Sequence, residues 1–105
     1  MAIARDLNKK RAPMHPGEIL REEFMNPRGV SAHALALALR VPATRISEIV
    51  NGRRGITAET AYRLSVHFGT SADMWMSLQS AYELARVERD LAAQIKKEVQ
   101  PRVVA

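Results

Sequence analysis

The sequence predicts an all-α domain of five helices, and three observations support this prediction. Alanine and leucine are abundant whereas aromatic residues make up 5% of the chain, a balance that favours helices packed on helices. Ser31, Thr57 and Ser71 each precede a run of helix-forming residues, as N-cap residues do. Proline and glycine residues separate these runs from one another.

The first helix is expected to begin at Pro16, because proline is tolerated in a first turn and the acid Glu18 suits the helix dipole. Apolar residues then recur at helical spacing. Pro27 is expected to end this helix by biasing Asn26 away from the helical region of backbone conformation.

The other four helices are expected over residues 32–40, 43–50, 58–68 and 72–98. The alternation from Ala34 to Leu39 fits neither a helical nor a strand period, and the propensities of alanine and leucine favour a helix. Val41 and Pro42 interrupt the chain, Asn51-Gly52 and Gly69 terminate helices, and Pro101 ends the last one.

The composition limits the classes of protein to which the chain can belong. Its 105 residues are enough for one domain, which we expect over residues 14–100, with a tail over 101–105. The absence of cysteine excludes disulfides, thiol nucleophiles and cysteine-ligated zinc. Since no apolar run is long enough to span a bilayer and no signal-peptide core follows the basic start, we expect a soluble, cytoplasmic protein without a membrane partner.

Positive charge is concentrated in the middle of the chain. The formal net charge is +5, and residues 30–55 contain four arginines but one acid, Glu48. This distribution is typical of proteins that attract polyanions. A second basic excess lies in residues 1–13, which lack an apolar period and are expected to form a mobile arm.

The helices expected over residues 32–40 and 43–50 have the proportions of a helix-turn-helix motif. Apolar side chains of both helices would face the core, with Val41 in the turn; these are Leu35, Ala36, Leu39, Ile46 and Ile49. A short, mostly polar set is left to point outward, as a surface that reads bases in the major groove requires; it comprises Ala43, Thr44, Arg45, Ser47 and Glu48. On these grounds alone, a generic helical hairpin is an equally good interpretation.

Several motifs resemble those of the Cro/cI-type (XRE) family of regulators, and more closely those of HigA-type antitoxins. The resemblance covers about Pro16 to Leu78. Its motifs are His15-Pro16-Gly17-Glu18-Ile19-Leu20 with Glu22, Glu23 and Phe24, the stretch from Ile46 through Asn51-Gly52-Arg53-Arg54 to Thr57, and Phe68-Gly69-Thr70-Ser71 with Trp75 and Leu78-Gln79. The chain departs from the family at residues 1–13 and at Ala43-Thr44, where more basic residues are usual, which leaves the operator sequence undetermined.

The resemblance implies a dimeric antitoxin that neutralises a HigB-type ribonuclease toxin and represses the promoter that the two genes share. It also implies functional positions. Residues at base-reading positions are Thr44, Arg45, Ser47 and Glu48. Residues near the phosphates of double-stranded DNA are Ala32, Asn51, Arg53 and Arg54.

Alternative roles remain open for the charged residues of this motif. Arg45 is suited to reading guanine by its expected exposed position near a helix N-terminus, and the alternatives are that it holds a phosphate or pairs with Glu48 on the surface. Arg53 and Arg54 follow the recognition helix, where guanidinium groups suit phosphate contacts better than a solvated loop. Glu48 would repel the DNA backbone unless it accepts from a cytosine amino group, and otherwise it is a partner for an arginine.

Enzymatic chemistry and metal binding have little support. No phosphate-binding glycine loop, activated serine or pair of carboxylates is recognisable, and the three histidines have no metal-ligand spacing, so neither a cofactor nor a metal is expected. Trp75 and Tyr82 are expected to anchor the core, because they lie on one face of the last helix.

The last helix carries an apolar seam that extends further than a small bundle can bury. Ile95 and Val99 continue this seam, so we expect them to contact a second copy of the chain in a homodimer that reads a palindromic operator. Two other functions remain open, namely a repressor without a toxin and an interaction module that no longer reads DNA.

Overall fold

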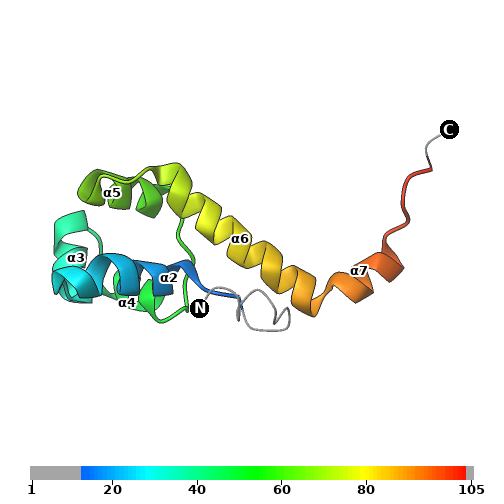
Figure 1. Ribbon diagram of the computed structural model, residues 1–105, viewed down its shortest axis with the longest axis horizontal. Helices are drawn as coiled ribbons and strands as arrows, with labels where there is room; N and C mark the ends of the chain where they lie inside the picture. Colours follow the sequence, from blue (N-terminus) through cyan, green and yellow to red (C-terminus); the bar gives the residue numbers. More distant parts are fainter. Residues whose placement is uncertain (1–12, 104–105) are drawn as a thin grey trace.

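The computed structural model describes residues 13–103, and this part of the chain is helical without any strand, as the sequence predicts (Figure 1). The expected basic arm over residues 1–13 lies outside the described residues except for Pro13, and of the expected tail the last two residues also lie outside them.

The first helical segment is continuous but changes geometry twice. It begins as α2 (Pro16–Ile19), widens into the π-helical η1 (Leu20–Met25), and tightens into the 3₁₀ turn η2 (Asn26–Arg28). The prediction that Pro27 displaces Asn26 from the helical region is wrong, because Asn26 has helical φ and ψ of −60° and −45°. Pro27 instead lies in the first turn of the 3₁₀ segment η2, the Arg28 guanidinium donates to the Phe24 carbonyl of the preceding turn at 3.0 Å, and Gly29 ends the segment with a φ of 64°.

Helices α3 (Ala32–Leu39), α4 (Ala43–Val50) and α5 (Ala58–Phe68) agree closely with the predicted ranges. The hydroxyl oxygens of Ser31 and Thr57 accept hydrogen bonds at the N-termini of α3 and α5, at 3.0 and 3.4 Å. Gly69 closes α5 in the left-handed conformation. These predicted caps are therefore confirmed, and so is that of Ser71, which caps α6.

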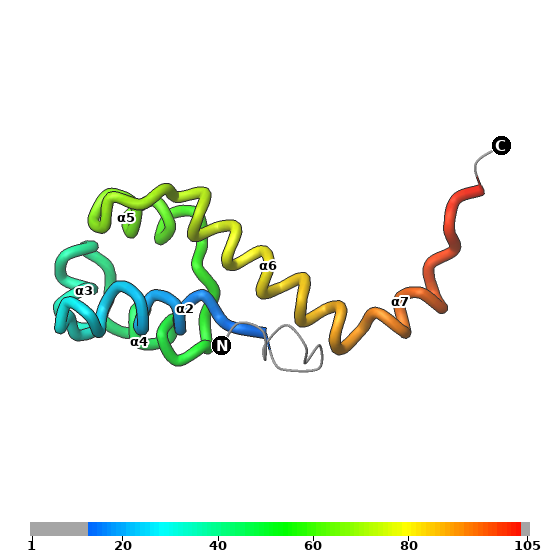
Figure 2. Tube along the Cα trace, in the orientation of Figure 1, coloured from blue at the N-terminus to red at the C-terminus, as the bar shows by residue number. Residues whose placement is uncertain are grey.

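The predicted last helix is divided into α6 (Ala72–Asp90) and α7 (Ala92–Glu98) by Leu91, whose φ and ψ are −126° and −8°. A single helix over residues 72–98 is therefore a wrong prediction. The break follows Asp90, a poor helix former at the C-terminal end of a helix, where a carboxylate opposes the dipole. The long first half of α6 packs on the domain, whereas α7 continues beyond it at an angle, as the tube trace shows (Figure 2).

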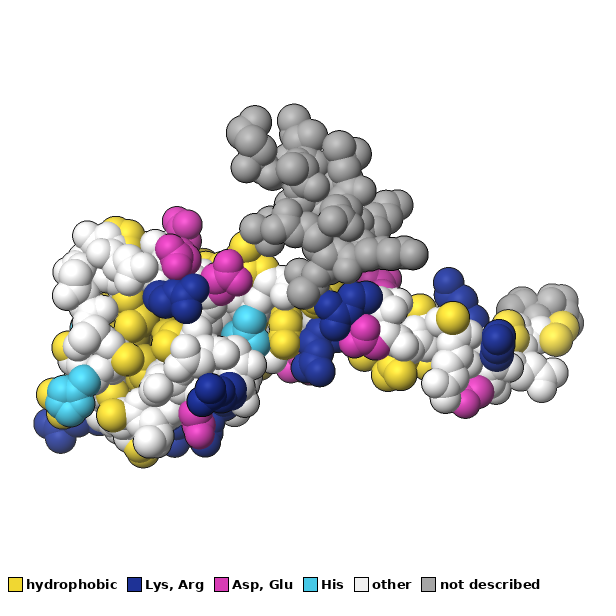
Figure 3. Space-filling model, turned by 90° about the horizontal axis from the view of Figure 1, so that it is seen from below, with side chains coloured by type: hydrophobic (Ala, Val, Ile, Leu, Met, Phe, Trp, Pro, Cys, Tyr) yellow, Lys and Arg dark blue, Asp and Glu magenta, His cyan; other side chains and the backbone are white. Residues whose placement is uncertain are grey.

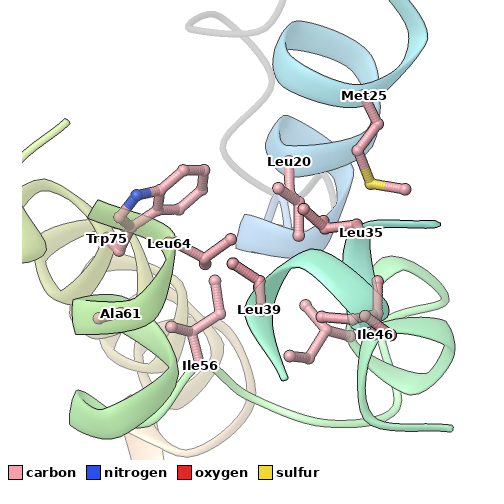
Figure 4. Close-up of a cluster of buried hydrophobic side chains, with 11 residues drawn as sticks. Leu20, Met25, Leu35, Leu39, Ile46, Ile56, Ala61, Leu64 and Trp75 are labelled. Carbon is pink, nitrogen blue, oxygen red and sulfur yellow. The ribbon is translucent and has the colours of Figure 1, made fainter. Parts of the chain in front are cut away.

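The hydrophobic core lies where α2, η1, α3, α4, α5 and the start of α6 meet. Figure 4 shows Leu20, Leu39, Leu64 and Trp75 converging from four of these elements. All of the helix-turn-helix residues predicted to face inward are buried, with Val41 half-buried against them. Because burying a side chain of this size stabilises the fold by roughly 1.5–3 kcal/mol, this core fixes the orientation of α4.

The aromatic prediction is confirmed for Trp75 but less fully for Tyr82. Trp75 has an exposed fraction of 0%, and its indole Nε1–H donates to the Thr70 hydroxyl at 2.8 Å. Tyr82 is half-buried and lies outside the core, where its ring meets the imidazole of His15 edge to face at 4.7 Å.

Candidate nucleic-acid interface

The turn between α3 and α4 is closed by Arg40, which has a left-handed backbone with a φ of 61°. Its N–H donates to the Leu37 carbonyl at 3.3 Å, and the N–H of Val41 donates to that of Ala36 at 3.1 Å. These bonds satisfy carbonyl groups at the end of α3 and fix the direction in which α4 departs. The sequence predicts this break at Val41-Pro42 and does not indicate Arg40, because residues other than glycine rarely adopt positive φ.

Helix α4 is fixed to the core by one face and presents the other to solvent. Ile46 and Ile49 are fully buried on the inner side. The outer side carries the predicted base-reading residues, of which Thr44 and Ser47 are exposed while Arg45 and Glu48 are half-buried. The structure thus brings these four residues together on one short helix.

Arg45 is held by a network that joins three helices. Its guanidinium lies 3.5 Å from the carboxylate of Glu59 on α5, and the guanidinium of Arg63 contacts the same carboxylate at 3.1 Å. Arg63 also donates to the main-chain carbonyl of Leu39, at the end of α3, at 2.9 Å. The ion pair between Arg45 and Glu48 that the sequence left open is absent from the described residues, where Arg45 pairs with Glu59 instead.

Glu48 is paired with Arg54, six residues further along the chain. The Arg54 Nε–H donates to Glu48 Oε1 at 2.8 Å, and both side chains are about half exposed. This contact realises the intramolecular role that the sequence allowed for Glu48. It also offsets the negative charge on the outer face of α4 with a cation from the following loop.

The residues predicted near phosphates surround α4. Asn51 follows its last turn, where its amide Nδ2–H donates to the Ser47 carbonyl at 2.8 Å. Arg53 and Arg54 are exposed in the next loop, and Ala32 is the half-buried first residue of α3. Figure 3 shows Lys and Arg side chains on the face that includes the underside of α4, with basic groups on both the rounded body and the long α6.

The loop after α4 is tied to α6 by Gln79, a residue to which the sequence analysis assigned no role. Its side-chain Oε1 accepts from the Ile56 N–H at 2.8 Å, and its Nε2–H donates to the Glu83 carboxylate at 2.7 Å. Gln79 is 7% exposed. A side chain at Gly55 would meet the amide group of Gln79 at 2.7 Å, so the loop and α6 are in close contact.

His15 forms a second tie between the loop and the rest of the domain. Its Nδ1 accepts from the Gly17 N–H at 2.9 Å and caps α2. Burial lowers the pKa of the His15 imidazole below its usual value; hydrogen bonding to the Arg54 backbone acts in the opposite direction, and the nearby Arg86 guanidinium lowers this pKa further. The motif that contains His15 was visible in the sequence, but its contact with a loop 39 residues away was not.

The two residues predicted at a dimer interface lie far from α4 along the chain. Ile95 is on α7, and Val99 directly follows that helix in an extended conformation. Their exposed fractions are 38% and 60%. They belong to an apolar stripe, together with Leu84, Val87 and Leu91, that the described part of this chain leaves uncovered.

Comparison with known proteins assigns this architecture to a family. The model of the helix-turn-helix family matches residues 20–75. Virulence-associated protein I of Dichelobacter nodosus is 57% identical over 77 residues, which cover 73% of this chain and 71% of that protein. A solved HigA-family addiction module antidote protein from Coxiella burnetii is 43% identical, with a TM-score of 0.82 over 88% of this chain and 100% of that one.

A further structure, Pseudomonas aeruginosa antitoxin HigA with the higBA promoter, is 47% identical, with a TM-score of 0.83 over 87% of this chain and 99% of that chain. The chain belongs to the HigA-type branch of the helix-turn-helix family. Relatives of the chain include proteins named antitoxins and proteins named HTH-type transcriptional regulators.

The described residues of this HigA-type chain contain neither a candidate membrane-spanning helix nor a candidate metal-binding cluster. No helix over the described residues has the length and apolarity needed to cross a membrane. Between residues 13 and 103, no three His, Asp or Glu side chains gather in a way that would hold a metal ion.

Proposed function

We propose that this HigA-type protein is an antitoxin that binds operator DNA through α4 and represses the promoter of its toxin–antitoxin gene pair. The observation that carries the proposal is the outer face of α4, where short polar and charged side chains stand on a helix held rigidly by the core. The P. aeruginosa relative was solved with promoter DNA, and its likeness to this chain extends over α4. A rigid recognition helix supports readout in the major groove.

In this proposal Thr44, Arg45, Ser47 and Glu48 read base edges, and Ala32, Asn51, Arg53 and Arg54 lie against the phosphates. The pair between Glu48 and Arg54 leaves the second carboxylate oxygen of Glu48 available to a cytosine amino group. On binding DNA, the Arg45 guanidinium leaves the Glu59 carboxylate and donates to a guanine edge instead. Because exposed ion pairs contribute only about 0–1 kcal/mol, this exchange costs little.

We further propose that the protein binds its operator as a homodimer. A single helix of eight residues, as α4 is, offers few base contacts, and a two-fold axis doubles them on a palindromic site. The apolar stripe that includes Ile95 and Val99 supports a contact between copies, because a second copy would remove these exposed apolar side chains from water. The double change Ile95→Lys and Val99→Lys places charges in this contact and should therefore yield folded monomers in sedimentation velocity runs. A dimer that survives the double change would exclude this interface.

The partner proposed for the antitoxin role is a HigB-type ribonuclease. Support comes from the relatives that are named antitoxins or antidote proteins. In this role a HigB-type ribonuclease should be encoded in the neighbouring gene, and the purified chain should stop its cleavage of RNA at about equimolar concentration. Full cleavage in the presence of excess chain would reduce the proposal to a repressor without a toxin.

Fluorescence anisotropy with the DNA upstream of the gene tests the DNA-binding role. Arg45→Ala should weaken binding to this DNA and reduce the preference over a scrambled duplex by about 1–3 kcal/mol for each half-site, since one base contact is lost there. Lys96→Ala is the matched control, because it removes the same charge from exposed α7. A wild-type protein that binds both duplexes equally well would contradict sequence-specific DNA binding.

A further inference from the structure

An open cavity of about 430 Å³ lies between the loop after α4 and the middle of α6. Arg53 and Arg54 line it from the loop, and Tyr82, Glu83 and Arg86 line it from α6. His15 closes the end of the cavity next to α2. Three guanidinium groups therefore share one depression, although Arg86 is 33 and 32 residues away from Arg53 and Arg54 in the sequence.

The charges around this cavity are unequally engaged. Arg54 is paired with Glu48, and the Glu83 carboxylate accepts from the buried amide of Gln79 at 2.7 Å. Over residues 13–103, by contrast, neither Arg53 nor Arg86 forms an ion pair. Two cations thus face the cavity with no anion of this chain directly paired with them.

The walls of the cavity are held at a fixed separation. Gln79 on α6 accepts from the main-chain N–H of Ile56, and a Cβ at Gly55 would lie 2.7 Å from the Gln79 amide nitrogen. On α6 itself, the Arg86 guanidinium lies 5.5 Å from the centre of the Tyr82 ring, which in turn packs against the His15 imidazole. Arg86 is thereby placed against the loop before any ligand arrives.

We propose that this cavity binds a phosphate group of the DNA backbone and that Arg86 extends the phosphate-contacting surface from the loop after α4 onto α6. The inference rests on the proposed operator binding and adds a residue to it. A phosphodiester suits the site because it carries one negative charge and two free oxygens, which the guanidinium groups of Arg53 and Arg86 can bind from different sides. Glu83 keeps its negative charge, but its carboxylate is exposed to water, which screens it, and the bond from the Gln79 amide holds it on α6.

Salt titration of operator binding tests this assignment. Each phosphate contact contributes about 0.9 to the slope of log affinity against log salt concentration. Arg86→Ala removes one contact from each protomer of the proposed dimer and should reduce that slope by about 1.8, so that the loss of affinity between about 50 and 200 mM salt becomes roughly 12-fold smaller. Arg86→Lys should retain most of the slope, since the positive charge remains.

Arg89→Ala is the control on the same helix, because Arg89 is already paired with Asp90 at 2.8 Å. It should leave the slope unchanged, and all variants should show the wild-type circular dichroism spectrum. A slope for Arg86→Ala equal to that of the wild type overturns the inference while leaving operator binding by α4 intact. A wild-type protein that fails to bind the operator at low salt would instead contradict the proposed function itself.

A second measurement separates DNA phosphate from free phosphate. Inorganic phosphate is titrated into the ¹⁵N-labelled protein while the amide signals of Gly52 and Gly55, which line the cavity, are followed by NMR. We expect no saturation at millimolar phosphate, because the open site obtains its affinity from the rest of the duplex. Saturation that Arg86→Ala abolishes would identify a site for free phosphate and overturn the assignment to DNA.

Discussion

Replacing Gln79 by methionine would test how the loop after α4 is held against α6. Methionine is unbranched and close to glutamine in length, so it fills the same space but neither donates nor accepts strongly. The change removes the acceptor for the Ile56 N–H, which lies in a buried environment. It also removes the donor to Glu83.

The expected loss of stability follows from these two contacts. Leaving a buried N–H without an acceptor costs about 1–3 kcal/mol. The bond to Glu83 contributes less, because that carboxylate is exposed and water replaces the amide. The free energy of unfolding should therefore fall by about 1–3 kcal/mol, and for a domain of this size each kcal/mol lowers the melting temperature by about 4–8 °C.

Urea denaturation followed by the fluorescence of Trp75 measures this loss, because Trp75 is the single tryptophan of the chain and is fully buried. Gln94→Met is the matched control. Gln94 is exposed on α7, where it donates to Glu98 at 2.9 Å, so its replacement should change stability by less than about 0.5 kcal/mol. If Gln79→Met is as stable as this control, the proposed tie between the loop and α6 contributes nothing and the reasoning is refuted.

Three further changes have defined outcomes. His15→Asn keeps a side chain that can cap α2 but cannot titrate. Burial lowers the pKa of His15 in the folded state, so the unfolded state binds more protons. The free energy of unfolding of the wild type should therefore fall more steeply than that of the variant as pH decreases from about 7.5 to 5. Parallel pH profiles from urea titrations would contradict this. Thr57→Ala removes the N-cap of α5 and should cost about 1 kcal/mol in the same assay, whereas an unchanged midpoint would show that the cap is dispensable. Gly17→Ala would place a methyl group on the backbone carbonyl of Ile49 and should lower stability by about 3 kcal/mol, whereas a wild-type melting curve would show that α2 can move away.

The parts of the fold that could be predicted are those that depend on neighbours in the sequence. The hydroxyl groups of Ser31, Thr57 and Ser71 each reach an N–H three residues further on, so their residue types were sufficient to indicate where helices begin. The inward face of the helix-turn-helix followed from the spacing of apolar residues for the same reason. Its pattern repeats within one or two turns.

Features that depend on distant or unusual contacts could not be predicted. Arg40 closes α3 in a conformation that its residue type disfavours, and tertiary packing decides it. The partner of Arg45 is Glu59, fourteen residues away, although the sequence offered Glu48 three residues away. Gln79 and His15 act on a loop that is distant from both in the chain, and no local pattern indicates such a contact.

These contacts alter the interpretation of the charge pattern. Counting residues gives four arginines against one acid over positions 30–55, yet Arg54 is offset by Glu48 and Arg45 by Glu59. The positive charge left unpaired beside α4 therefore comes from Arg40 in the turn before the helix, from Arg53 in the loop after it, and from Arg86, which lies outside the basic segment altogether. Because exposed ion pairs are worth at most about 1 kcal/mol, the paired arginines can still turn to DNA, but only after an anionic partner gives them up. Phosphate attraction should thus begin at these unpaired arginines, on the turn before α4 and at the cavity between the loop and α6, and the reading residues of α4 should engage afterwards, when bases compete with Glu59 and Arg54 for their partners.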